Sequence, residues 1–306
     1  MINQQIKIIA GPCSINKNNI KEIYQISQLK VKGKPAIWGT RVVGLKSRSV
    51  FSKEPSISGM DMTWFENTLE NYLTKKELKA TPAFSVTTAK KILKETHLVV
   101  AAEIMSPLIQ LPSFEEPIFK NRLLVWNPAV NQLGWPIFIM GKYAIKNHWW
   151  LGLKNPKWVG EDLKIVDSEK TSKISTMEKT WEGLITYGQL KERTILIHRG
   201  VDVAEKGDYR NLPVHQIAKK VKQRTGCQLF FDPSHSFGPK LKDNIVEQTV
   251  KTMQLLVSPK EFLYDGILIE VGTSTTDTEQ HINLDELKRL VYNLSKFRIL
   301  ETNEKN

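Results

Sequence analysis

Side chains that can bind a metal ion follow short apolar runs at several points of the chain. Gly11-Pro12-Cys13-Ser14 follows the first run, and Asp232-Pro233-Ser234-His235 follows the seventh. The eighth run contains Glu270, and Asp277 comes shortly after it. A thiol, an imidazole and two carboxylates make a mixed set that suits Mn²⁺, Fe²⁺, Co²⁺ or Zn²⁺ better than Mg²⁺ or Ca²⁺. The sequence therefore predicts a four-ligand site for a divalent transition metal.

A second group of candidate residues is basic, with one hydroxyl: Arg41, Lys46, Arg48, Ser49, Arg199 and Arg210. Guanidinium groups match the geometry of phosphate and carboxylate, and lysine adds a compact charge. Each group has an alternative role, because basic loops are usually solvated and a lone cysteine is usually a small buried apolar residue. Together, the two groups predict a metal-containing pocket for small phosphorylated molecules.

Eight apolar runs supply the elements that must position these side chains. Most are near-continuous, which is typical of parallel strands covered on both faces. The predicted strands are Ile6–Ala10, Ala36–Val43, Leu98–Met105, Leu123–Trp126, Pro136–Met140, Thr194–His198, Gln228–Phe231 and Gly266–Val271. Helical periodicity predicts helices over Asn18–Gln28, Thr87–Thr96, Thr176–Leu190, Val214–Arg224, Ile245–Leu256 and Leu284–Lys296. Thr176-Met-Glu-Lys and Asn283-Leu-Asp-Glu are typical helix N-termini.

Strands that alternate with helices predict a (β/α)8 TIM barrel, with a doubly wound open sheet as the alternative. In a barrel, the polar residues after the strands meet at one end, where the chemistry of this fold takes place. The long segment Gly141–Arg193 predicts an enlarged loop after the fifth strand. No linker divides the strands, so residues 1–306 are expected to form a single catalytic barrel domain.

Composition narrows the class of protein. The 306 residues include 44 Lys and Arg against 32 Asp and Glu, a net charge of +12. These charges are dispersed, so small anionic substrates explain them better than nucleic acid does. The two cysteines cannot form a disulfide framework, and neither a bilayer-spanning run nor a signal peptide is present. We expect a cytoplasmic homo-oligomer without nucleic-acid or membrane partners.

Six motifs resemble those of the 3-deoxy-7-phosphoheptulonate (DAHP) and 3-deoxy-manno-octulosonate 8-phosphate (KDO8P) synthases. They are IAGPCSI, RVVGLKSRS, ILIHRG, DYRNL, FFDPSHS and ILIEVG followed by TTD, and the resemblance runs from about Lys7 to Lys296. It implies a barrel enzyme of the shikimate pathway, a transferase that condenses phosphoenolpyruvate with erythrose 4-phosphate and releases phosphate. It also implies a metal site formed by Cys13, His235, Glu270 and Asp277.

The resemblance assigns roles to the basic group as well. Arg41 and Lys46 match the pair that contacts phosphoenolpyruvate, and Arg199 matches the arginine at its phosphate; Lys46 and Arg199 are expected to be catalytic. Arg48 and Ser49 match the turn that holds the aldose phosphate, while the DYRNL segment with Arg210 resembles single-domain bacterial DAHP synthases. The Lys-x-Arg-Ser spacing is closer to DAHP synthases than to KDO8P synthases.

Two positions depart from the family pattern. The fourth predicted strand leads into Trp126-Asn127-Pro128 where the family has Gly-Ala-Arg, and the fifth has Met140 where the family has a lysine. Lys142 lies two residues further on and would share the face of Met140. We predict it as a catalytic replacement, with a solvated Lys142 after a strand break at Gly141 as the alternative. These departures leave open another acceptor such as arabinose 5-phosphate, another donor, or a homologue without activity.

Overall fold

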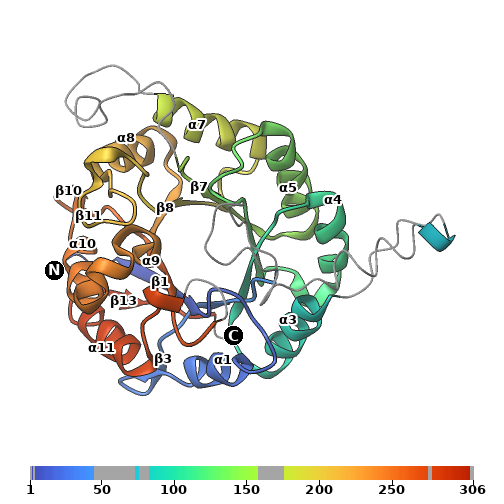
Figure 1. Cartoon of the computed structure of the whole chain (residues 1–306), viewed down its shortest axis with the longest axis horizontal. Helices are drawn as coiled ribbons and strands as arrows, with labels where there is room; N and C mark the ends of the chain where they lie inside the picture. Colours follow the sequence, from blue (N-terminus) through green and yellow to red (C-terminus); the bar gives the residue numbers. More distant parts are fainter. Residues whose placement is uncertain are drawn as a thin grey trace.

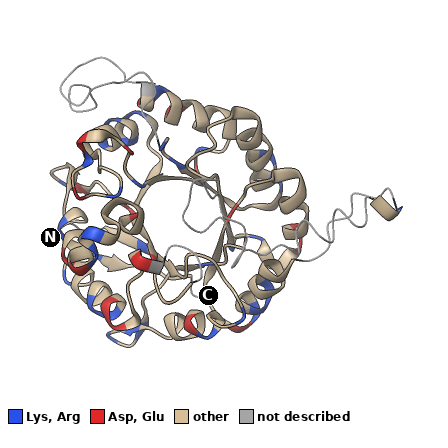
Figure 2. Cartoon of the chain, in the orientation of Figure 1, with Lys and Arg blue, Asp and Glu red and all other residues tan. Residues whose placement is uncertain are grey.

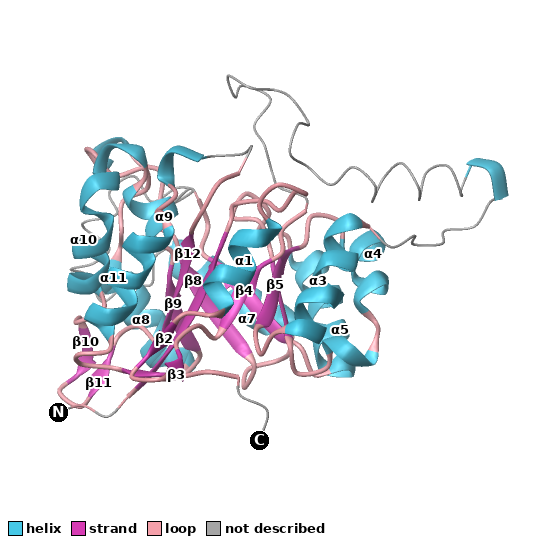
Figure 3. Ribbon diagram, turned by 90° about the horizontal axis from the view of Figure 1, so that it is seen from below, coloured by secondary structure: helices cyan, strands magenta, loops and turns pink. Residues whose placement is uncertain are grey.

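Eight parallel strands close into a barrel surrounded by helices (Figures 1 and 3). This architecture comes from a computed structural model that describes residues 2, 4–44, 73–75, 83–157, 176–274 and 278–303. In order around the barrel, the strands are β1 (Gln5–Gly11), β4 (Gly39–Arg41), β5 (Val99–Glu103), β6 (Leu123–Trp126), β7 (Trp150–Lys154), β8 (Thr194–His198), β9 (Gln228–Phe231) and β12 (Gly266–Glu270). Pairing of β12 with β1 closes the ring. The predicted TIM barrel is confirmed, and the open-sheet alternative is wrong.

The helices form the outer ring of the molecule. They are α1 (Ile20–Ser27), α3 (Phe84–Glu95), α4 (Pro107–Gln110), α5 (Gly134–Asn147), α7 (Thr176–Gly188), α8 (His215–Thr225), α9 (Pro233–Phe237), α10 (Ile245–Thr252) and α11 (Leu284–Leu294). All six predicted helices are present, and Asn283 and Glu286 form a capping box at the start of α11. Basic and acidic residues both occur along this ring (Figure 2). No helix in the described ranges is long and apolar enough to cross a bilayer.

The predicted fifth strand is wrong. Pro136–Met140 lies within helix α5, whose buried positions include Ile137, Met140 and Ala144. Pro136 is tolerated because it lies in the first helical turn, where backbone N–H groups have no partner within the helix. The fifth strand is β7, inside the segment Gly141–Arg193 that we predicted as an enlarged loop. Much of that segment, including α7, therefore belongs to the regular alternation of strands and helices.

Side chains of the barrel strands alternate between two apolar cores. One set packs inside the barrel and includes Ile9, Ala101, Leu124, Ile197 and Leu268. Their strand neighbours, such as Ala10 and Val125, belong to the core between the barrel and the helices. This period of two is the expected geometry of barrel strands. It also decides which polar residues at the strand ends face the barrel axis.

Three smaller pairings lie outside the barrel ring. Short antiparallel pairs are formed by β2 (Lys30–Val31) with β3 (Lys34–Pro35), and by β10 (Leu256–Ser258) with β11 (Glu261–Phe262). Strand β13 (Ile299–Leu300) pairs with the start of β1. This last pairing brings the segment after α11 to the N-terminal end of the barrel.

Candidate active site at the C-terminal end of the barrel

The last inward-facing residues of the eight strands form what we call the terminal ring. In strand order, these residues are Gly11, Arg41, Glu103, Trp126, Lys154, Arg199, Asp232 and Glu270. Three members are basic and three are acidic. All six charged side chains are at most 6% exposed. Because charges are costly to bury, such a ring at the functional end of a barrel marks a candidate active site.

Three metal-competent side chains meet on one side of the terminal ring. Donor atoms of Cys13, Glu270 and His281 all lie within 4.8 Å of one another, and all three residues are buried. Cys13 follows β1, Glu270 ends β12, and His281 lies just before the capping box of α11. The structure thus brings together two of the four predicted ligands and adds a histidine that sequence reasoning missed.

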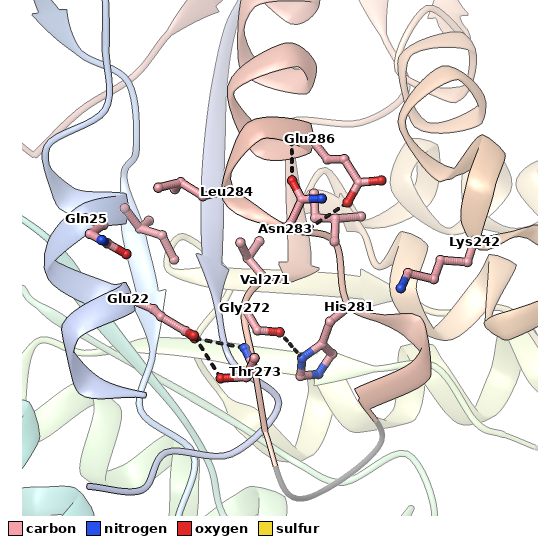
Figure 4. A pocket seen from close by; sticks show the side chains of 12 residues that line it. Glu22, Gln25, Lys242, Val271, Gly272, Thr273, His281, Asn283, Leu284 and Glu286 are labelled. Atoms are coloured by element: carbon pink, nitrogen blue, oxygen red, sulfur yellow. Dashed lines mark hydrogen bonds between the residues drawn. The ribbon is translucent and has the colours of Figure 1, made fainter. Parts of the chain in front are cut away.

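The His281 ring is oriented by the segment that follows β12 (Figure 4). Its Nδ1 lies 2.7 Å from the Gly272 carbonyl oxygen, and its Nε2 lies 3.4 Å from Glu270 Oε2. The neighbouring Thr273 is anchored to Glu22 of α1 through its backbone N–H and its hydroxyl, each at 2.8 Å. Gly272 has a φ of 90°, a left-handed conformation that favours glycine. The protein thereby directs the Nε2 of His281 toward Glu270.

His235 approaches the same group from β9. Its Nε2 lies 3.9 Å from Glu270 Oε1, while its Nδ1 lies 2.8 Å from Asp232 Oδ2. Such a carboxylate–histidine pair is the usual support of a metal-binding imidazole, because it fixes the tautomer and the ring orientation. His235 is therefore placed as the sequence predicted, next to Glu270.

The two histidines differ in protonation. Burial lowers the pKa of His235 to about 4, in spite of Asp232 and Glu270, so its imidazole is neutral at pH 7. Burial also acts against the charged form of His281, but hydrogen bonds and charge interactions with Cys13 and Glu270 outweigh it and raise the pKa to about 9. A divalent cation bound among these donors would take the place of that proton. The residues present therefore fit a metal of the Mn²⁺, Fe²⁺, Co²⁺ or Zn²⁺ group.

Arg41 connects the candidate metal ligands to the basic part of the terminal ring. Its Nη2 lies 3.0 Å from Glu270 Oε1 and donates to the Cys13 carbonyl oxygen at 3.2 Å. Its buried Nε and Nη1 have no hydrogen-bond partner among the residues that the structure describes. Buried donors of this kind normally have partners. An anionic ligand would supply them.

Arg199 is a second open cation. Its backbone N–H donates to Asn155 Oδ1 at 2.8 Å, which fixes the chain just after β8. Its guanidinium forms no hydrogen bond or ion pair within the described parts of the chain, although the residue is only 6% exposed. Burial lowers the pKa of Arg199 in spite of Asp232, and the neighbouring Arg210 lowers it further. The structure thus places the predicted residues Arg41 and Arg199 in the terminal ring, with Arg210 near enough to Arg199 to act on its charge.

Lys154 provides the third cation of the ring. Its Nζ lies 2.8 Å from Glu103 Oε2, and the Trp126 indole donates to the same oxygen at 3.0 Å. Asn127 accepts a hydrogen bond from the Lys154 backbone N–H at 2.9 Å, which joins β6 to the end of β7. Burial lowers the pKa of Lys154, although Glu103 and Asp232 oppose this effect.

Lys142 does not lie at this site. It is an exposed residue of α5, with its Nζ 5.1 Å from the centre of the Phe138 ring. The prediction that it points into the barrel is wrong, because it assumed a strand where the chain forms a helix. The true fifth strand, β7, ends in Lys154. Of the other predicted site residues, Lys46, Arg48, Ser49 and Asp277 lie outside the described residues.

Comparison with known proteins supports the same fold. The described barrel is similar to the solved structure of phospho-2-dehydro-3-deoxyheptonate aldolase (DAHP synthase) from Thermotoga maritima, with a TM-score of 0.65 and 19% identity. The match covers 96% of this chain and 69% of that chain. The chain has the fold of a DAHP synthase. No protein-family profile matches the sequence, and neither does any curated protein.

Sequence reasoning missed Glu103, Lys154 and His281. Glu103 ends a correctly predicted strand, so its inward position was accessible from the alternation of Val99, Ala101 and Glu103. Lys154 was missed because Gly152 interrupts the apolar run of β7. His281 lies beyond the strand, and only the fold brings it back to Cys13.

Proposed function

We propose that this protein is a metal-dependent synthase that condenses phosphoenolpyruvate with an aldose phosphate and releases inorganic phosphate. The favoured acceptor is erythrose 4-phosphate, which gives 3-deoxy-7-phosphoheptulonate. The observation that carries the proposal is the cluster of Cys13, Glu270 and His281 directly beside Arg41. The same end of the barrel thereby combines candidate metal ligands with open guanidinium groups, and the fold of a DAHP synthase agrees with the proposal.

In this proposal, Cys13, His235, Glu270 and His281 hold the metal, together with Asp277 from the segment after β12. A metal held by these residues would supply Lewis acidity toward the aldehyde oxygen of the acceptor. The chain's own cations bind and orient the donor: Arg41 and Arg199 offer unpartnered guanidinium donors, and Lys154 offers a fixed ammonium. Arg210 and the predicted residues Lys46, Arg48 and Ser49 are assigned to the remaining anionic groups.

The bonds change as follows. The C2–C3 double bond of phosphoenolpyruvate supplies the electron pair for a bond from C3 to the aldehyde carbon, and the π electrons of the aldehyde move to its oxygen. Water adds at C2, and its proton goes to that oxygen. The phosphate then leaves C2, and the product carries a 2-oxo acid. The buried terminal ring limits the access of other water molecules to the donor, which favours condensation over simple hydrolysis.

The test is phosphate release from phosphoenolpyruvate with Mn²⁺ and a panel of acceptors that includes erythrose 4-phosphate and arabinose 5-phosphate. We expect release that depends on both the acceptor and the metal, with erythrose 4-phosphate the best acceptor. Release with arabinose 5-phosphate alone would reassign the acceptor. A protein that binds phosphoenolpyruvate without release would be a non-catalytic homologue, and no binding of this donor would overturn the proposal.

A further inference from the structure

We propose that Trp126 determines the size of the donor that the barrel accepts, because its indole contacts both Arg41 and Lys154. This inference rests on the proposed function, in which both cations bind the donor. Trp126 is the one aromatic member of the terminal ring. It stands at the end of β6, where the sequence offers no Arg or Lys between Trp126 and Trp135.

The indole lies against both cations. The centre of a Trp126 ring is 5.3 Å from Lys154 Nζ and 5.8 Å from Arg41 Cζ. These separations are within the range of cation–π contacts, which stabilise a desolvated cation above an aromatic ring. The side chain is completely buried and belongs to the apolar core inside the barrel. The indole thus forms a wall shared by the two cations.

In this proposal, a donor held by both cations lies beside this wall. Its anionic atoms would lie about 3 Å from Arg41 and from Lys154, the usual hydrogen-bond distance. The indole is in contact with the same two groups, so the carbon atoms next to the anionic group face the ring. A three-carbon enol acid leaves little surface to collide with it, whereas an added substituent at C3 would compete with the indole for space.

The wall is fixed in place. The indole Nε1 donates to Glu103 Oε2 at 3.0 Å, and this oxygen also holds Lys154. Gly152 of β7 makes room for the aromatic side chain, because a Cβ at this position would lie 2.8 Å from the Trp126 Cβ. The hydrogen bond to Glu103 and the packing of the barrel core hold the indole in this orientation.

The experiment compares phosphoenolpyruvate with its 3-methyl derivative as donors. Selectivity is the ratio of their kcat/KM values, measured by phosphate release with the best acceptor. For the wild type we expect a ratio of at least about 10, as for other pockets that reject one added carbon. Trp126→Leu should lower the ratio to within about 3, and Trp126→Phe should give an intermediate value.

A matched control is available in Trp181 of α7. It is also fully buried and donates from Nε1 to a backbone carbonyl, that of Leu153 at 3.0 Å, but it lies outside the barrel. Trp181→Phe and Trp181→Leu should keep the wild-type selectivity. If Trp126→Leu does not fold, Trp126→Phe must still lower the ratio by about threefold.

The outcomes separate this inference from the proposed function. If the wild type uses phosphoenolpyruvate and every folded Trp126 variant keeps its selectivity, Trp126 does not set donor size. The same conclusion follows if the Trp181 variants lose selectivity equally. A wild type that uses neither donor would contradict the proposed function, and it would also contradict the role of Trp126 in setting donor size.

Discussion

The two ends of the barrel both bury cationic side chains, but they differ in whether these cations have partners within the protein. At the N-terminal end, Lys7 pairs with Glu301 at 3.0 Å and Gln228 at 3.2 Å, and its Nζ lies 5.8 Å from the ring of Trp38. At the C-terminal end, two donors of Arg41 and the guanidinium of Arg199 have no partner within the described part of the chain.

This difference separates structural charges from functional ones. An unpartnered buried charge destabilises a fold by several kcal/mol, so it is tolerated only where a ligand completes it. The N-terminal cation joins the first strand to the segment after the last helix, and its partners are internal. At the C-terminal end, we propose that the open donors of Arg41 and Arg199 bind a substrate.

The largest losses of turnover and stability are expected on substitution of Lys154. Replacing it with Met should lower turnover at least about a hundredfold, since in the proposed function its ammonium orients the donor. It should also destabilise the fold by about 3–5 kcal/mol, because Glu103 would remain buried without its ion pair. Phosphate release and urea unfolding measure the two effects.

Two variants serve as controls for Lys154. The double variant Glu103→Gln/Lys154→Met should regain most of the stability and none of the activity. Lys142→Met, on the exposed surface of α5, should change turnover by less than about twofold. A large loss of activity in Lys142→Met would show that our assignment of the fifth-strand lysine is wrong.

A smaller effect, on stability, is expected from a network of histidines and a tyrosine on the helix-facing side of β8, next to Arg199. The Val214 N–H donates to His198 Nε2, so Nδ1 of His198 donates to the Tyr264 hydroxyl at 2.7 Å. That hydroxyl in turn lies 2.7 Å from His215 Nδ1, and burial lowers the pKa of His215 to about 4. This network is neutral and internally partnered, unlike Arg199.

The pH dependence of stability follows from that pKa. Below its ordinary pKa of 6.5, His215 takes up a proton in the unfolded chain but not in the folded protein. The contribution of His215 to the free energy of unfolding is therefore constant above pH 6.5. It declines by up to about 3 kcal/mol as the pH falls to 4. His215→Gln should have a correspondingly flatter profile in urea unfolding at a series of pH values. Parallel profiles would contradict the buried, neutral state.

At the N-terminal end, Lys7→Met tests the structural half of the contrast. We expect a loss of about 1–3 kcal/mol in the free energy of unfolding, because charged hydrogen bonds are removed while the stem of the side chain is kept. Turnover of the folded protein should remain within about twofold of the wild type. A selective loss of activity would show that this end also contributes to function.

At the candidate metal site, Cys13→Ala should reduce metal occupancy severalfold without changing the fold. Loss of one ligand weakens metal binding, while Glu270 and the two histidines remain in place. Metal analysis after dialysis, with circular dichroism as the check on folding, gives the answer. Retention of about one metal ion per chain in this variant would remove Cys13 as a ligand.

The fold was predictable because buried parallel strands are near-continuous apolar runs. Seven of the eight predicted strands exist, and the error has a local cause. Helix α5 is apolar on most of its surface and resembles a strand over Pro136–Met140, whereas Gly152 interrupts the apolar run of β7. Gly152 is needed because Trp126 occupies the adjacent space. The sequence does not reveal this contact between Gly152 and Trp126.

Residues of the candidate site could be predicted where a side chain able to bind a metal or an anion lies at the end of a recognisable strand. Cys13, Arg41, His235 and Glu270 all follow or end a recognisable strand, and the structure brings them together. His281 escaped prediction because it lies eleven residues beyond Glu270 and reaches the site through a turn at Gly272. The pairing of Lys154 with Glu103 escaped because the true fifth strand was assigned to a loop.

The most direct test of the account is the affinity of Arg199→Ala for phosphoenolpyruvate, measured by titration calorimetry beside the wild type. If this unpartnered guanidinium binds the donor, its removal should weaken binding by about 1.5–3 kcal/mol, roughly ten- to a hundredfold in Kd. The free energy of unfolding should stay the same or rise, because no internal partner is lost. An unchanged affinity, or a destabilised protein, would contradict the claim that the open charges at this end of the barrel exist to bind a substrate.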